Sequence, residues 1–234
     1  MLDLAYGASR AHMSTDEISN RRCTWLLNQR GFRYWREAHI GQVVPLQDTN
    51  PDFLVETPVP VRFFLELKSF EQDTLLDRID PSVRTFSVGI MSLQKRANRL
   101  VRDAAEQLFP YADAGLPMII MLDNYRQKGI SLDHHTLGGL FGELQVQIRI
   151  NPTTGENLGE AWVRSDDGSP LAGGRNRHVS AVAALVAGWR FDTFDKVDDF
   201  SVERRMKVRV LCNPDAAVPL PRDVFGDTDD EHLN

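Results

Sequence analysis

The chain has 234 residues, of which 42% are hydrophobic and 26% charged, and its formal net charge is −6. This composition is typical of a globular domain with a sizeable core, and no apolar run is long enough to span a membrane. The first residues lack the basic and apolar regions of a signal peptide. Cys23 and Cys212 are far apart and form no CxxC pair, so we expect unpaired thiols in a cytoplasmic protein.

The negative charge is distributed unevenly. Five acidic residues and no basic residue lie within residues 223–231, and without them the chain would be close to neutral. Basic residues cluster at 21–22, 30–36, 95–102 and 204–209. Because local fields decide partner choice more than the total charge does, the composition does not exclude a polyanionic substrate. The acidic end is also a candidate docking surface for a basic protein partner.

The N-terminal part begins with a helical pattern. Ser14 and Glu17 have the spacing of a capping box, and Gly31 is a typical residue just beyond a helix end. We therefore predict a helix over residues 14–31. Residues 32–40 alternate between apolar and polar side chains, which predicts a strand.

Residues 50–70 (NPDFLVETPVPVRFFLELKSF) predict a hairpin of two short strands around a proline-rich turn. Side chains two apart on a strand share a face. Glu66 and Lys68 should therefore point to one side, while Leu65 and Leu67 point to the other side into apolar packing. Asp52, where the first strand begins, can reach the same place as Glu66.

The next elements are a long helix over residues 92–112, with apolar positions three and four apart, and a buried strand over residues 118–122. The C-terminal half is less regular. It predicts strands at 143–150, 161–163 and 201–212, a loop at 165–177, and a strand or a helix at 179–191. The pattern as a whole predicts an α/β fold with a mixed sheet.

The pair Pro51-Asp52, followed after a hairpin by Glu66-Leu67-Lys68, resembles the signature of the PD-(D/E)XK nuclease superfamily. The resemblance covers residues 14–125, about half of the chain, and includes the flanking helices. It implies a restriction-endonuclease-like mixed β-sheet flanked by helices. Residues 126–212 would then be a β-rich extension of the same domain, and residues 213–234 an acidic, flexible tail.

The chemistry of these side chains agrees with the resemblance. Asp52 and Glu66 offer the hard oxygen ligands that Mg²⁺ or Mn²⁺ prefers, and the backbone carbonyl of Leu67 is a natural third ligand. Lys68 can orient or help to deprotonate the attacking water, or stabilise the charge that develops on the phosphate. The resemblance assigns these catalytic and metal-binding roles to the same positions. The alternative is structural: Asp52 caps a turn, and Glu66 and Lys68 form a surface pair on an edge strand.

Other candidate site residues lie on the two predicted helices. Glu17 is either a further metal ligand, as the resemblance suggests, or the capping partner of Ser14. On the second helix, Gln94, Arg99 and Arg102 are candidates for contacts with the nucleic acid. Their alternative is an ordinary solvated helix face.

From the sequence we therefore expect a metal-dependent nuclease that hydrolyses phosphodiester bonds in DNA, in a restriction or defence, repair or mobile-element role. The alternative is a non-catalytic subunit of the same fold that binds nucleic acid or docks onto a protein partner. A homodimer would suit double-strand cleavage, although nothing in the sequence specifies one. No separate DNA-reading motif is visible.

Overall fold

A computed structural model of the chain describes residues 15–70, 90–124, 132, 134–142, 144–164, 168–187, 206–225 and 231–233. The strands of its main sheet are β1 (Arg33–Arg36), β2 (Phe53–Glu56), β3 (Arg62–Ser69), β4 (Met118–Asp123), β7 (Ala181–Ala187), β8 (Met206–Cys212) and β9 (Glu231–Leu233). The helices are α1 (Thr15–Gln29), α2 (Glu37–Ile40), α4 (Ile90–Leu108) and α5 (His134–Gly138). Short 3-10 helices lie at Phe109–Ala114, Gly139–Phe141 and Ala172–Gly174.

Among the described residues, the main sheet has seven strands in the order β1-β2-β3-β4-β7-β8-β9. The strands β1, β2 and β3 are antiparallel, whereas β3, β4 and β7 run parallel to one another. The strand β8 then returns antiparallel to β7, and β9 lies parallel to β8. This arrangement confirms the predicted mixed sheet in an α/β fold.

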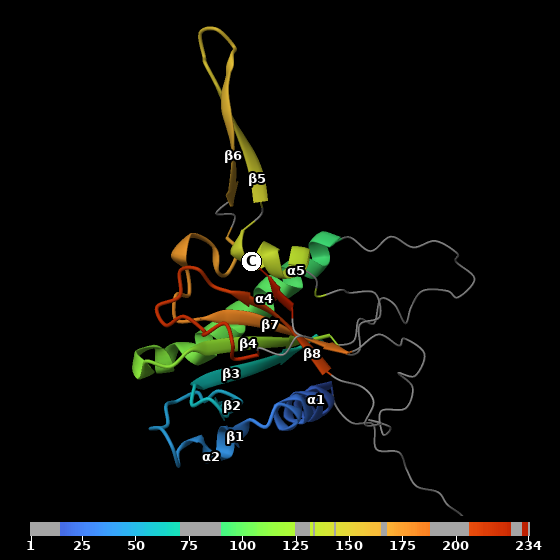
Figure 1. Ribbon diagram of the computed structural model, residues 1–234, viewed down its shortest axis with the longest axis vertical. Coiled ribbons are helices and arrows are strands. Elements are labelled where there is room, and N and C mark those ends of the chain that lie inside the picture. The colour runs from blue at the N-terminus through green and yellow to red at the C-terminus, as the bar shows by residue number, and fades with distance from the viewer. Residues whose placement is uncertain are drawn as a thin grey trace, which may run out of the picture.

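The two long helices cover opposite faces of the sheet (Figure 1). Leu65 packs with Leu26 and Leu27 of α1, while Phe64 packs with Val101 of α4. Alternate residues of β3 therefore contribute to different cores, as the period of a strand requires. The predicted assignment of Leu65 and Leu67 to the opposite side from Glu66 and Lys68 is confirmed.

Several predicted elements are confirmed, and one is wrong in part. The helices α1 and α4, the β2–β3 hairpin and the strand β4 lie where the sequence placed them, and β7 settles residues 181–187 as a strand. The strand predicted over residues 32–40 ends at Arg36, because Glu37 begins the short helix α2. Glutamate and alanine favour helix at this point, and the N–H of Glu37 donates to the carbonyl of Asp52 at 3.0 Å.

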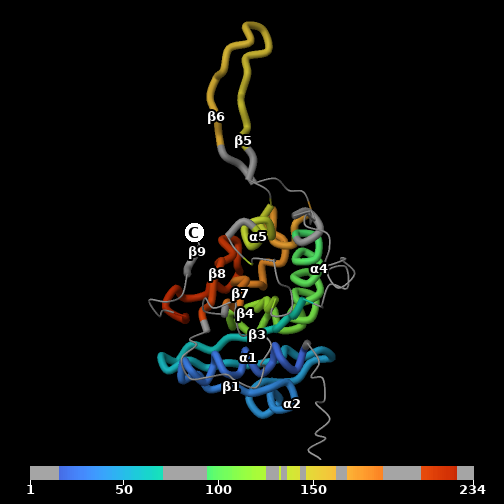
Figure 2. Tube along the Cα trace, turned by 90° about the vertical axis from the view of Figure 1, so that its right-hand side faces the viewer, coloured from blue at the N-terminus to red at the C-terminus, as the bar shows by residue number. Residues whose placement is uncertain are grey.

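The strands β5 (Leu144–Ile150) and β6 (Asn157–Arg164) form a two-stranded ribbon of their own. Figures 1 and 2 both show this ribbon projecting from the body of the molecule. Val146, Ile148 and Ile150 lie two apart along β5 and are all exposed. The apolar alternation that predicted a strand therefore holds, but here the apolar side chains face outward and not into a core.

A flexible tail was expected over residues 213–234, but the described residues 213–225 pack in part against the sheet. Leu220, Val224 and Phe225 are buried on the α1 side of the sheet, and Phe225 is only 1% exposed. Its ring lies against those of Phe32 and Phe63, at centroid distances of 6.2 and 6.0 Å. Burial of these apolar side chains therefore holds the segment against the sheet, although its composition is acidic.

None of the described helices has the length and apolar character needed to cross a membrane. Both cysteines are unpaired, as predicted. Cys23 is fully buried, and its sulfur lies 4.0 Å from that of Met121.

Candidate active site

A cavity of about 460 Å³ opens at the end of β3, between the N-terminal half of α1 and the helix α4. Its lining is predominantly polar and comes from α1, β3 and α4, together with Asp52 just before β2 and Phe70 just after β3. The lining residues are Asp16, Ser19, Asn20, Asp52, Glu66, Leu67, Lys68, Ser69, Phe70, Arg96, Arg99, Leu100 and Gln107. The structure thus brings together Asp52, Glu66, Leu67 and Lys68, which the sequence had grouped.

The register of the hairpin places the two carboxylates together. Phe53 pairs with Leu65, so Asp52, one residue earlier, comes opposite Glu66. The backbone N–H of Asp52 donates to Oε2 of Glu66 at 3.2 Å, and the N–H of Leu67 donates to Oδ2 of Asp52 at 2.8 Å. Each carboxylate is therefore held by a backbone donor of the opposite strand, which fixes both side chains before any ligand binds.

Pro51 explains why the carbonyl of Leu67 is available at this point. If the ladder continued, Pro51 would lie opposite Leu67, and the two residues would exchange both backbone hydrogen bonds. Proline has no N–H, so it cannot donate to the carbonyl of Leu67. The N–H and C=O of one residue in such a pair face the same neighbouring strand. The N–H of Leu67 donates to Asp52, so the carbonyl of Leu67 also faces Asp52.

Lys68 lies between the two sides of the cavity. Its Nζ is 2.8 Å from Oε1 of Glu66 and also donates to Oε1 of Gln107 on α4. The sequence did not single out Gln107. Gln107 lies eleven residues after Arg96 and therefore on the same side of the α-helix, but only the structure shows that this side of the helix lines the cavity. Gln107 fixes the direction of the Lys68 side chain.

Burial shifts the protonation of both carboxyl groups. Glu66 is only 2% exposed, and desolvation together with the charge of Asp52 raises its pKa to about 7, against the opposing effect of Lys68. Desolvation likewise raises the pKa of Asp52, although the Leu67 N–H and Lys68 oppose the shift. The cation that acts on these two carboxyl groups is Lys68, so at their end of the cavity two carboxylates face one ammonium, while Arg96 and Arg99 also line the cavity. Such a site favours the binding of a cation.

The acidic residues of α1 divide between two hollows. Asp16 lines the cavity, and its Oδ1 accepts a hydrogen bond from the hydroxyl of Ser69 at 2.6 Å. Glu17, the predicted metal ligand, is exposed and lines a second hollow on the other side of Asp52. The alternative role of Glu17 in a capping box depends on Ser14, which lies outside the described residues.

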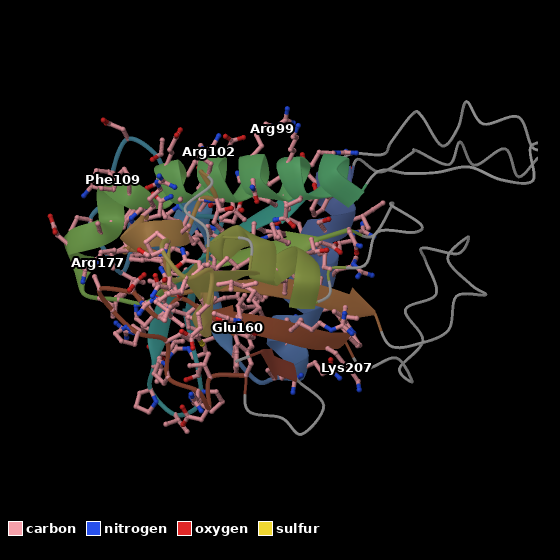
Figure 3. All side chains as sticks on the ribbon, turned by 90° about the horizontal axis from the view of Figure 1, so that it is seen from above. Arg99, Arg102, Phe109, Glu160, Arg177 and Lys207 are labelled. Carbon is pink, nitrogen blue, oxygen red and sulfur yellow. The ribbon has the colours of Figure 1, made fainter. Side chains whose placement is uncertain are left out.

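The three candidates on α4 have different surroundings. Arg99 lines the cavity together with Arg96, which the sequence did not single out. Arg99 and Arg102 are both exposed, and Figure 3 shows them along the outer edge of α4. Arg102 donates to the carbonyl of Gly168 at 3.4 Å. Gln94 donates to Asn98 at 2.9 Å and lies close to Gly139, outside the cavity lining.

The donor set suits a hard cation that keeps part of its water shell. Within the described part of the chain, no three histidine, cysteine, aspartate or glutamate side chains are grouped closely enough to hold a metal between them. Mg²⁺, however, usually binds proteins through one or two carboxylates and retains several waters. Asp52 and Glu66, with the carbonyl of Leu67, fit that pattern, whereas a fully protein-coordinated metal would not fit here.

Comparison of the chain with family models, with curated proteins and with solved structures finds no match.

Proposed function

We propose that the chain is a Mg²⁺- or Mn²⁺-dependent nuclease that hydrolyses phosphodiester bonds in DNA. One observation carries the proposal: Asp52 and Glu66 lie together beside Lys68 in an open cavity, and both carboxyl groups have a raised pKa. Burying charged groups costs folding free energy. Acidic groups that lie together in a cavity and have shifted pKa values are typical of catalytic sites.

Each side chain has a role that follows from its place. Asp52, Glu66 and the carbonyl of Leu67 would hold the cation, which supplies positive charge to the phosphate and lowers the pKa of water. Lys68 orients the attacking water and stabilises the charge that develops on the phosphate, while Gln107 holds Lys68 in place.

Arg96 and Arg99 contribute a second positive region at the rim of the cavity. Guanidinium groups match the geometry of phosphate oxygens, because their N–H groups form a planar fork. We therefore assign these two residues to contacts with phosphates next to the reacting one. The basic surface of α4 supports a polyanionic substrate despite the negative charge of the whole chain.

The fold also supports the proposal. Along the chain, α1 is followed by three antiparallel strands, then by α4 and the parallel strand β4. This is the order that the PD-(D/E)XK resemblance implies for residues 14–125. The candidate site lies where β2 begins, beside the C-terminal part of β3.

The proposal is tested by incubating the protein with plasmid, linear duplex and single-stranded DNA or RNA in Mg²⁺, Mn²⁺ or EDTA. Matched samples carry Asp52→Asn, which keeps the acceptor for Leu67, and Lys68→Met, which keeps the length of the side chain. We expect metal-dependent cleavage that is lost in both variants. Cleavage that survives in both would contradict the proposal. Salt-sensitive binding without any cleavage would favour the non-catalytic alternative.

A further inference from the structure

A second hollow of about 430 Å³ lies on the other side of Asp52 from the cavity. It is formed by α1, the end of β1 and the start of α2. Its lining residues are Glu17, Asn20, Arg21, Arg36, Glu37, Ala38 and Asp52. The cavity and this second hollow share Asn20 and Asp52. The catalytic carboxylate therefore stands where two hollows meet, and not at the end of a closed pocket.

Both hollows carry a pair of arginines. Arg96 and Arg99 line the cavity, and Arg21 and Arg36 line the second hollow. Arg21 comes from α1 and Arg36 from the end of β1, so two separate elements bring these guanidinium groups to one place. Because arginine binds phosphate through a planar fork of donors, each pair can hold a phosphate diester.

Acidic side chains restrict where an anion can lie in the second hollow. Three acids, Glu17, Glu37 and Asp52, share its lining with Arg21 and Arg36. A free anion would therefore be attracted by the arginines and repelled by the acids. A phosphate that belongs to the same chain as the reacting phosphate is instead held near the hollow at high local concentration. The second hollow thus suits a neighbouring phosphate of a longer substrate better than a separate small anion.

We propose that the substrate is a polynucleotide that continues on both sides of the cleaved bond, so that the enzyme needs no chain end. Arg96 and Arg99 bind the chain on one side of the reacting phosphate, and Arg21 and Arg36 bind it on the other. This inference rests on the proposed nuclease function. Water forms the new O–P bond, the P–O ester bond breaks, and the leaving oxygen takes up a proton, so no co-reactant other than water is needed.

The test compares covalently closed circular DNA with linear DNA of the same sequence, in Mn²⁺. Both substrates are duplex or both are single-stranded, according to which form the protein cleaves. We expect cleavage of the circle at an initial rate within about threefold of the linear rate. The first product should be the nicked circle for duplex DNA, or the full-length linear strand for single-stranded DNA. The double variant Arg21→Ala/Arg36→Ala should raise KM about 10-fold or more, with kcat within about threefold, because only binding of a flanking phosphate is lost.

The matched control is Arg33→Ala. Arg33 lies on the same strand as Arg36, but its guanidinium is 3.3 Å from Glu56 and lines neither hollow. KM should therefore stay unchanged in this variant. A rise in KM equal to that of the double variant would contradict the assignment of Arg21 and Arg36.

The possible failures are distinguishable. Cleavage of linear DNA without cleavage of the circle would overturn the inference and leave the proposed nuclease function intact. If neither DNA is cut, the nuclease proposal fails, and binding of the circle then decides the inference. Salt-sensitive binding that weakens about 10-fold in the double variant would support the two-sided path, and binding that does not weaken would overturn it.

Discussion

The central strands carry a buried ion pair on each side of the sheet, and the two pairs differ in charge balance. On the α4 side, Nζ of Lys68 lies 2.8 Å from Glu66 in the open cavity. On the α1 side, Nε of Arg22 lies 3.0 Å from Asp123 at the end of β4. The side chains of Arg22 and Asp123 are 5% and 0% exposed, whereas that of Lys68 is 21% exposed.

This difference is the reason that we propose a function for the pair of Lys68 and Glu66 and a structural role for the pair of Arg22 and Asp123. Arg22 and Asp123 balance each other and connect α1 to the sheet. Beside Lys68, by contrast, two carboxylates share one ammonium, and the pKa of both acids is raised. A sealed and balanced pair gives a ligand nothing to bind, while an open and unbalanced one attracts a cation. Burial of charge alone is therefore a weaker sign of function than burial with an unmatched charge.

The largest change in stability is expected at the fully buried pair of Arg22 and Asp123. Arg22→Met leaves Asp123 buried without its cation, so the free energy of unfolding should fall by about 3–5 kcal/mol in urea titrations. The loss is severe because the second oxygen of Asp123 has no hydrogen-bond partner among the described residues. The double variant Arg22→Met/Asp123→Leu should recover most of it. A single variant within about 1 kcal/mol of the parent protein would show that the pair does not stabilise the fold.

At the pair of Lys68 and Glu66 in the open cavity, stability should depend on pH. The pKa of Glu66 is raised from 4.5 to about 7, so between these values the folded chain binds more protons than the unfolded chain. Stability from this group is present at low pH and is lost as the pH rises through about 7. Without metal, we expect the free energy of unfolding to fall by about 2 kcal/mol between about pH 5 and pH 7.5.

Glu66→Gln is the control for this pH dependence, since glutamine cannot titrate. Urea titrations at the two pH values should show that the free energy of unfolding falls by about 2 kcal/mol less in this variant than in the parent protein. Added Mn²⁺ should restore stability at the higher pH in the parent protein only. Equal pH dependence in both proteins would mean that Glu66 ionises normally.

A smaller effect is expected for the residue that holds Lys68. Gln107→Met keeps the length of the side chain but removes the acceptor for Nζ of Lys68. We predict about a 10-fold lower kcat, with a free energy of unfolding within about 0.5 kcal/mol of the parent value, because the cavity is open to water. An unchanged kcat in cleavage assays would mean that Glu66 alone positions Lys68.

The smallest effect should come from an ion pair on the surface. Nε of Arg62 lies 2.5 Å from Glu56, but the Arg62 side chain is about half exposed. Arg62→Ala should lower the free energy of unfolding by about 0.5 kcal/mol in the same urea titrations. A loss as large as that of Arg22→Met would show that exposure does not separate the pairs as described here.

The sequence predicted those parts of the site that depend on short-range periodicity. The alternation of β3 placed Glu66 and Lys68 on one face, and the hairpin length brought Asp52 opposite them. Arg22 and Asp123 could not be paired in this way, because they lie 101 residues apart and meet only when α1 packs on β4. The position of Asp16 in the cavity likewise depends on the rotation of α1, which is set by tertiary packing.

Two other differences have the same origin. The alternation of β5 predicted a strand, but not that Ile148 would be exposed on a projecting ribbon, because period alone does not say whether a core covers the apolar face. The acidic composition of residues 223–231 gave no sign of the burial of Phe225, which depends on packing against Phe32 and Phe63, residues far away in the sequence.

The most direct test of the nuclease proposal is the single-turnover rate of Mn²⁺-dependent DNA cleavage by Lys68→Met, measured beside its free energy of unfolding. We predict a rate about 10³-fold or more below that of the parent protein, with a free energy of unfolding within about 1 kcal/mol of the parent value. A cleavage rate within about 10-fold of the parent rate would show that the group of Asp52, Glu66 and Lys68 is not the catalytic centre.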